Sequence, residues 1–141
     1  MAKPRFVYLL NVAQRRVHAW IQAGGDGHSA ARAGLLMLLD RSRPTPAAAV
    51  QQALELGAPA MSALIARALE AGLVAREADP DDGRAWRLRL TAAGEAGRRE
   101  AVRIARELDA RLCAGFSAEE LAVVARWLEA TRDKFPKGES A

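Results

Sequence analysis

The sequence predicts a mainly α-helical chain with one small β-hairpin. Aromatic residues make up only 5% of the 141 residues, and alanine, leucine and arginine are abundant. Over most of the chain, apolar residues recur at three- and four-residue spacing, which indicates amphipathic helices. Residues 73–90 instead contain two short apolar runs separated by Pro, Asp and Gly. Since these residues favour tight turns, this stretch predicts the hairpin.

Two helices are expected before residue 40. The first includes the apolar positions from Phe6 to Ile21, which keep a helical spacing, and it ends at Gly24-Gly25. The second begins near His28 and Ser29. Its apolar residues are almost contiguous ("LLMLL"), which is typical of a helix buried on most sides.

A helix-turn-helix is predicted over about residues 45–71. Thr45 is a favourable N-cap and Pro46 suits the first helical position, so a short helix begins here and ends near Gly57. Pro59 then opens a further helix, which Gly72 closes as the residue after its last turn. A short helix, a turn that contains glycine and a second helix are typical of this motif.

A hairpin and two more helices follow. The runs "LVARE" and "AWRLRL" predict two strands joined by "ADPDDGR". Thr91 is expected to cap a long helix that reaches about Ala114, and Ser117 to Glu120 have the spacing of a capping box that starts a last helix. The sequence therefore predicts a winged helix-turn-helix with extra helices at both chain ends.

Composition limits the classes of function. A single cysteine, Cys113, excludes an internal disulfide, and two histidines are too few for a metal site without carboxylates. No catalytic constellation or phosphate-binding loop stands out, so we expect a protein that is not an enzyme and needs no cofactor or metal. The densest apolar run, "AGLLMLL", is too short to cross a bilayer, and no signal peptide is visible, so we expect a cytoplasmic protein. The net charge of +4 is compatible with a polyanionic partner.

Three segments resemble the multiple-antibiotic-resistance regulator (MarR) family of bacterial transcription factors. "LGAPAMSALIARALEAGLVAR" is similar to that family's recognition helix and its exit into the wing, and "DPDDGRAWRLRLTAAG" is similar to its wing. The terminal helices match its dimerisation helices in position. The resemblance implies one winged-helix domain over residues 1–141, with a DNA-binding lobe at about 28–90 and dimerisation helices at about 4–23 and 91–134.

The resemblance also implies where duplex DNA would be contacted. Asp82 and Arg84 fall on the family's Asp-x-Arg unit, in which the arginine enters the minor groove and the aspartate braces the tip. A guanidinium suits this role because it is always charged and a narrow minor groove concentrates negative potential. We expect further contacts from the fourth helix, from the loop before the helix-turn-helix and from the second strand of the hairpin. The residues are, in that order, Ala60, Ser62, Ala63 and Arg67, then Arg41 and Arg43, and Arg87.

Two of these contacts stay open at the level of sequence. Arg87 and Arg89 alternate with Trp86, Leu88 and Leu90, so they share the solvent face of the strand and either meet phosphate or stay hydrated. The fourth helix carries one basic residue, Arg67, and lacks most side chains that read base edges. Affinity would then rest on phosphate contacts and the wing more than on base contacts.

A homodimer and an effector are implied as well. Apolar residues on more than one face of the first helix and on the last helix favour pairing of two chains. In the family, small aromatic or amphipathic molecules bind between the dimerisation helices and the DNA-binding lobe, and they loosen the DNA complex. We expect such a crevice near His18, Trp20, His28 and Met61. For Cys113 a buried, inert position is favoured over a redox role, since nothing nearby lowers its pKa.

The sequence thus predicts a dimeric regulator, most simply a ligand-responsive repressor on a pseudo-palindromic operator. The alternative is a winged-helix protein-interaction module that has lost sequence-specific DNA reading. The scarcity of polar residues on the fourth helix favours that alternative, because exposed alanine suits a protein surface better than a base edge.

Overall fold

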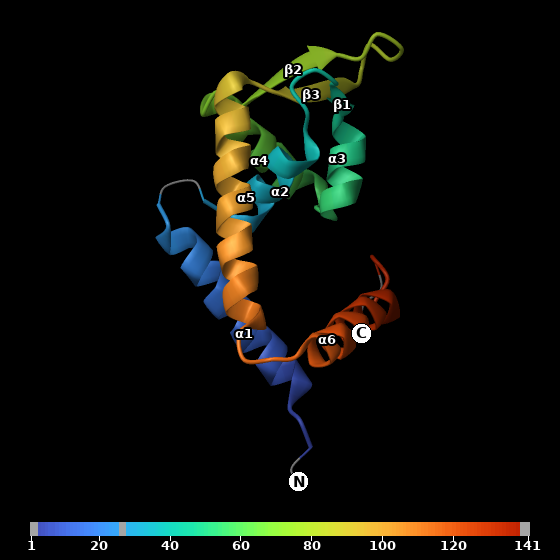
Figure 1. The fold of residues 1–141 in the computed structure, drawn as a ribbon. Coiled ribbons are helices and arrows are strands. Elements are labelled where there is room, and N and C mark those ends of the chain that lie inside the picture. Colours follow the sequence, from blue (N-terminus) through green and yellow to red (C-terminus); the bar gives the residue numbers. More distant parts are fainter. Residues whose placement is uncertain (1–2, 26–27, 139–141) are drawn as a thin grey trace. The chain divides into compact units, whose positions relative to one another are not determined.

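The computed structural model describes residues 3–25 and 28–138 (Figure 1). The chain divides into two compact units, Met1–Ile104 and Ala105–Ala141. The helices are α1 (Phe6–Ala23), α2 (Ala30–Leu38), α3 (Ala47–Leu54), α4 (Ala58–Glu70), α5 (Ala92–Cys113) and α6 (Ala118–Lys134). The strands are β1 (Thr45–Pro46), β2 (Val74–Ala78) and β3 (Trp86–Leu90).

The predicted fold class is confirmed: a mainly helical chain with a helix-turn-helix, α3 and α4, followed by a hairpin, β2 and β3. The three strands form one antiparallel sheet in the order β1-β3-β2. In the hairpin, Val74 pairs with Leu90 and Ala78 with Trp86. The sheet and the helices α2, α3 and α4 lie at the same end of the first unit (Figure 1).

One hydrophobic core holds this lobe together. Side chains from α2, α3, α4 and the sheet are buried in it, among them Leu35, Leu36, Val50, Leu64 and Leu88. Burying a leucine or valine side chain contributes about 1.5–3 kcal/mol relative to leaving it in water. The core therefore fixes the helix-turn-helix against the base of the hairpin.

The predicted N-cap of the third helix is wrong. Thr45 and Pro46 form the short strand β1, and they pair with Leu88 and Arg87 of β3. Pro46 has φ −55° and ψ 133°, an extended conformation, so α3 begins only at Ala47 and has no side-chain cap. The pairing with β3 holds this residue extended, which moves the start of the helix past the proline.

The other predicted helix signals act as expected. Thr91 Oγ1 accepts a hydrogen bond from Gly94 N at 3.0 Å at the start of α5. Ser117 and Glu120 form both bonds of a capping box at the start of α6. Gly72 follows the last turn of α4 with φ 69°, a conformation that favours glycine.

Apolar side chains remain exposed on several helices, above all on α1, α2 and α6. In α2, Leu35 and Leu36 are buried but Met37 and Leu38 are 40% and 45% exposed, so this helix is buried on fewer sides than the sequence suggested. No residue of α1 or of α6, both of which are described throughout, is buried. Within the described residues, the helices are too short or too polar to span a membrane.

Candidate nucleic-acid interface

The loop between β2 and β3 is folded by its own aspartates. Asp79 Oδ1 accepts a hydrogen bond from Asp81 N at 2.9 Å, and Asp82 Oδ1 accepts one from Arg84 N at 3.0 Å. Backbone bonds from Asp79 N to Ala85 O and from Ala85 N to Asp82 O, both 3.0 Å, close the loop. Each aspartate thus makes the local bond that stabilises a turn, and the tip of the wing has a defined backbone.

Arg84 is exposed at this tip. Among residues 3–25 and 28–138, no side chain pairs with its guanidinium, since Asp82 binds the backbone N–H of Arg84 instead. The aspartate therefore fixes the backbone from which the arginine projects. The result is a free, permanently charged group on a braced loop.

The two arginines of β3 lie on the opposite strand face from Leu88 and Leu90. Arg87 stands directly opposite Glu77, and Arg87 Nη2 lies 2.7 Å from Glu77 Oε1. Arg87 Nε is buried without a hydrogen-bond partner. Arg87 thus forms an ion pair with Glu77 within the sheet, whereas Arg89 is partly exposed.

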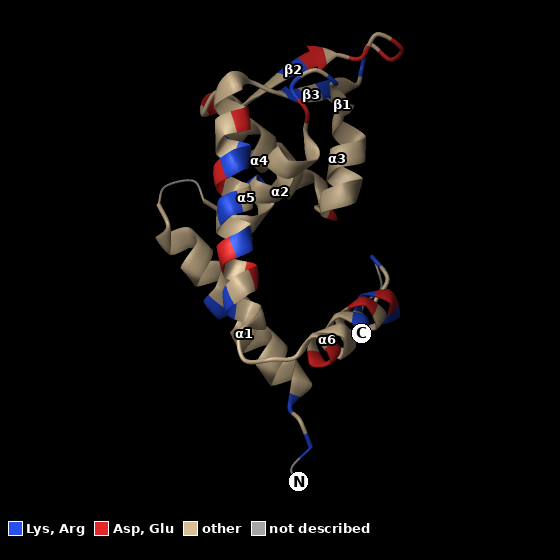
Figure 2. Ribbon diagram, in the orientation of Figure 1, with Lys and Arg blue, Asp and Glu red and all other residues tan. Residues whose placement is uncertain are grey.

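The outer face of α4 is nearly free of charge. Met61, Leu64 and Ala68 point into the core. At 100° per residue, the opposite arc of the helix carries mainly small, exposed residues. These are Pro59, Ser62, Ala63 and Ala66; Glu70 lies on the same arc in the last turn, and Ala60 is exposed at the start of the helix, nearer to the core side. Most of the ribbon of α3 and α4 is tan in Figure 2, whereas the sheet carries both blue basic and red acidic residues.

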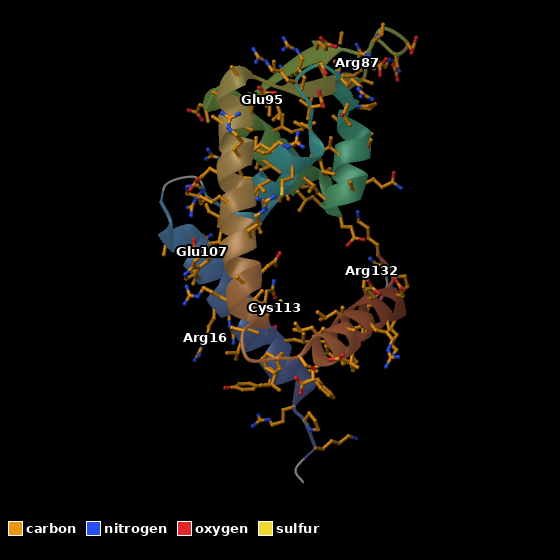
Figure 3. The ribbon with its side chains drawn as sticks, viewed as in Figure 1. Arg16, Arg87, Glu95, Glu107, Cys113 and Arg132 are labelled. Carbon is orange, nitrogen blue, oxygen red and sulfur yellow. The ribbon has the colours of Figure 1, made fainter. Side chains whose placement is uncertain are left out.

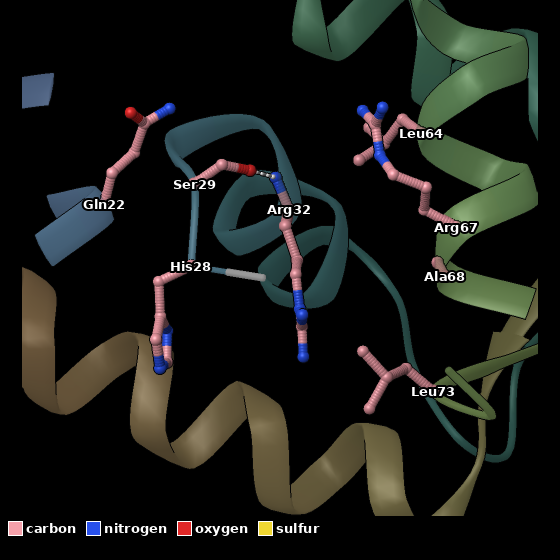
Figure 4. Close-up of a pocket in the computed structure, with 8 residues that line it drawn as sticks. All are labelled: Gln22, His28, Ser29, Arg32, Leu64, Arg67, Ala68 and Leu73. Atoms are coloured by element: carbon pink, nitrogen blue, oxygen red, sulfur yellow. Dashed lines mark hydrogen bonds between the residues drawn. The ribbon is translucent and has the colours of Figure 1, made fainter. Parts of the chain in front are cut away.

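Arg67 lies at the edge of that arc, where it lines a pocket rather than the centre of the outer face. The pocket has a volume of about 320 Å³ and lies within the first unit. Figure 4 shows its wall residues, which come from α1, the segment just before α2, α2, α4 and the turn between α4 and β2. They are Gln22, His28, Ser29, Arg32, Leu64, Arg67, Ala68 and Leu73.

The residues predicted to line an effector crevice are only partly brought together. His28 lines the pocket. His18 does not, but its Nε2 lies 3.1 Å from Nε2 of Gln22, which does. Trp20 is half-buried outside the described pocket wall, and Met61 is 4% exposed in the core. Met61 belongs to the buried face of α4 and packs in the core.

Arg32 lines the pocket together with Arg67 and His28, although no sequence pattern had pointed to it. Part of its position could be predicted, because serine is a favourable N-cap. Ser29 Oγ accepts a hydrogen bond from Arg32 N at 3.1 Å, and this bond fixes the first turn of α2, which carries Arg32. What the sequence could not show is that α4 lies across from that turn.

Cys113 is exposed, so the expectation of a buried cysteine is wrong for this chain. It occupies the last position of α5, where no core side chains cover it. Within residues 3–25 and 28–138, His, Cys, Asp and Glu side chains form no group of three that could hold a metal ion.

Comparisons with known proteins agree with this architecture. The MarR family model matches residues 27–85, which include the helix-turn-helix and most of the wing. No curated protein sequence is significantly similar to the chain.

Several solved structures share the fold over nearly the whole chain. A probable transcriptional regulator from Pseudomonas aeruginosa is 26% identical, with a TM-score of 0.81, over 90% of this chain and 96% of that one. BpsR from Bordetella bronchiseptica, whose DNA binding is regulated by 6-hydroxynicotinic acid, is 23% identical, with a TM-score of 0.78, over 92% and 100%. A MarR mutant from E. coli complexed with operator DNA is 20% identical, with a TM-score of 0.76, over 90% and 91%.

These matches agree with the predicted resemblance to MarR-family transcriptional regulators. Residues 27–85 are thus similar to MarR-family proteins, and the chain shares its winged helix-turn-helix fold with solved transcriptional regulators.

Proposed function

We propose that the chain binds duplex DNA as a homodimer and represses transcription from a pseudo-palindromic operator until an effector releases it. The observation that carries this proposal is Arg84: an exposed guanidinium without a side-chain partner among the described residues, on a wing tip that Asp79 and Asp82 fold. The negative potential of a narrow minor groove attracts such a positively charged group. The MarR mutant solved with operator DNA, which has the same fold, supports the assignment.

The remaining DNA contacts follow from the same placement. Ser62 can donate a hydrogen bond to a phosphate or a base edge, and Ala60 and Ala63 can touch a thymine methyl group. Arg41 and Arg43 are exposed in the loop before β1 and would bind phosphates. Arg67 and Arg87 are weaker candidates, because one lines the pocket and the other is bound to Glu77.

Two chains are needed because one recognition helix reads only a half-site. In this proposal the lobe at about residues 28–90 binds DNA, and helices within 4–23 and 91–134 form the dimer. The exposed apolar side chains of α1 and α6 support it. They include Phe6, Val7, Tyr8, Leu9, Val123, Val124 and Leu128, which are between 47% and 77% exposed in the single chain. A regulator of this kind must reach its operator DNA, and the predicted cytoplasmic location would allow this.

The pocket is suited to a small aromatic acid. Leu64, Ala68 and Leu73 offer an apolar surface, and Arg32, Arg67 and His28 offer donors for a carboxylate. BpsR, of the same fold, responds to 6-hydroxynicotinic acid, an aromatic acid. Since Arg67 belongs to α4, a ligand bound here would act on the recognition helix directly.

The test is binding to fragments of genomic DNA at low salt, first by mobility shift and then by fluorescence anisotropy with a captured fragment. Arg84→Ala is expected to lose roughly 1–3 kcal/mol of binding free energy. Arg106→Ala is the matched control, because it removes the same charge from an exposed position of α5. Equal affinities of the two variants would remove the wing from the mechanism.

The same experiment decides on the alternative, a winged-helix module that binds a protein. The small, uncharged face of α4 favours this alternative, since most base-reading side chains are missing from it. A wild-type protein that shifts no genomic fragment at low salt would favour it over DNA binding.

A further inference from the structure

The loop between α2 and β1 is organised by one carboxylate. Asp40 Oδ1 accepts hydrogen bonds from Ser42 N at 2.7 Å, from Ser42 Oγ at 2.8 Å and from Arg43 N at 3.3 Å. The hydrogen bonds from Ser42 hold the pKa of Asp40 below its ordinary value. The ionised carboxylate therefore fixes the path of the three residues that follow it.

Neighbouring elements tie this loop down from outside. Leu90 N at the end of β3 donates to Asp40 O at 2.9 Å. Arg98 Nη1 of α5 donates to Leu39 O at 3.2 Å. Figure 3 shows Glu95 on the first turn of α5, at the end of the lobe where Arg87 marks the sheet. The loop is thus a rigid part of the base of the wing.

This rigid loop presents two cations. Arg43 is exposed, and among the described residues its guanidinium has no partner. Arg41 Nη1 lies 3.3 Å from Glu95 Oε2, with side chains 55% and 40% exposed. Such an exposed pair is weak and is screened by salt, so a phosphate can replace Glu95 as the partner of Arg41.

We propose that Asp40 is a positioning residue for DNA binding: it holds Arg41 and Arg43 as a phosphate clamp at the base of the wing. This inference rests on the proposed function. From Leu90, which is bonded to the loop, to Arg84 at the tip is a rise of roughly 20 Å at about 3.3 Å per residue. The clamp and the tip would then contact the duplex at separate points, and the clamp would fix the angle at which the wing enters.

The test compares Asp40→Ala with Asp40→Asn. Both remove the negative charge, but only Asn keeps an oxygen that can accept the bonds from Ser42 and Arg43. Affinity for a labelled mixed-sequence duplex of about 30 base pairs is measured over a range of salt concentrations, because each phosphate contact contributes about 0.9 to the slope of log affinity against log salt. Thermal unfolding of each variant accompanies the measurement.

Asp40→Ala is expected to bind roughly 5- to 30-fold more weakly, with a slope shallower by about one to two contacts, and Asp40→Asn is expected to keep the wild-type slope. A loss of folded protein alone would lower the active fraction without changing the slope. The double variant Arg41→Ala/Arg43→Ala should reproduce the slope of Asp40→Ala, and Arg106→Ala should not.

Three results would overturn the proposal. The first is a wild-type slope of log affinity against log salt for Asp40→Ala. The second is an equal increase in affinity for Asp40→Ala and Asp40→Asn, which would mean that only the loss of negative charge matters. If Asp40→Ala does not fold, a wild-type slope for Arg41→Ala/Arg43→Ala overturns it. Failure of the proposed function itself is distinct, because then the wild-type protein does not bind the duplex.

Discussion

Gly94 is a position where the fold has no room for a side chain. A Cβ built there would overlap the carbonyl oxygen of Leu73 and lie 3.1 Å from Leu90 Cδ2. The same carbonyl oxygen accepts a hydrogen bond from Thr91 N at 3.0 Å. The start of α5 therefore lies directly against the chain that enters the wing, and glycine permits this contact.

Gly94→Ala is expected to lower the free energy of unfolding by about 3 kcal/mol, because the added methyl group meets backbone that cannot move aside. Urea-induced unfolding measures the change. Gly83→Ala is the control, since a Cβ at that wing position has nothing within 4 Å, and it should stay within about 0.5 kcal/mol of wild type. Equal stability of the two variants would contradict this reading of the packing.

Under the proposed function, Glu77 would determine whether Arg87 is available to DNA. Arg87 Nη2 is bound to Glu77 at 2.7 Å. Glu77→Gln should weaken that bond and let Arg87 reach a phosphate, which raises DNA affinity and steepens the salt dependence by about 0.9. Glu129→Gln, at an exposed position of α6, is the control for the change in net charge. A raised affinity with an unchanged slope would mean that Arg87 stays within the sheet.

Among the helices and strands, boundaries that depend on nearby residues could be predicted, and those that depend on distant residues could not. Gly72 predicted the end of α4, and Thr91 and Ser117 predicted the starts of α5 and α6, because these residues act on backbone within a few positions. The strand β1 was missed because it has two residues, and its partner β3 lies about 40 positions further along the chain. Thr45 and Pro46 have the local chemistry of a helix start, and only that distant pairing makes them a strand.

The same limit applies to the candidate site. The Asp82–Arg84 turn lies within the wing motif, so the sequence pointed to it. Arg41 and Glu95 are 54 positions apart, and no spacing rule connects them. The pocket depends on the packing of α2 against α4, so His28 was named without Arg32, and Met61 was placed near the crevice although it faces the core.

The capping box of α6 makes a prediction at this scale. Ser117 Oγ accepts from Glu120 N at 3.2 Å, and Glu120 Oε2 accepts from Ser117 N at 2.8 Å. Ser117→Ala should cost about 1 kcal/mol of stability, whereas Ser117→Asp should keep most of it because aspartate also caps helices well. Thermal unfolding of the three proteins checks this, and a fully stable Ser117→Ala would show that the cap contributes nothing.

For the molecule as a whole, the positive charge is not concentrated on the helix-turn-helix. Residues 74–90 carry four arginines and four acidic residues, and α3 carries no charge at all. One lobe therefore has few phosphate contacts to offer beyond Arg84 and the loop at 40–43. Useful affinity then requires two lobes acting together, since joining two weak contacts multiplies their effect.

The exposed apolar residues of α1 are the means by which two chains could be joined. Leu9, 53% exposed, lies one turn from Phe6 and next to Leu10 in the same stripe. Leu9→Glu should convert a dimer, of twice the 15.2 kDa chain mass, into a monomer in sedimentation experiments, because a buried unpaired carboxylate is strongly disfavoured at such an interface. DNA affinity should fall by at least about 100-fold as the second half-site contact is lost. Arg15→Gln changes the net charge by the same amount at an exposed position on the side of α1 opposite Phe6, and it should leave both properties unchanged. If the wild-type protein is a monomer at the concentration where it binds DNA, or if Leu9→Glu binds as tightly as wild type, the two-lobe mechanism is wrong, and the contacts of a single lobe must account for the affinity.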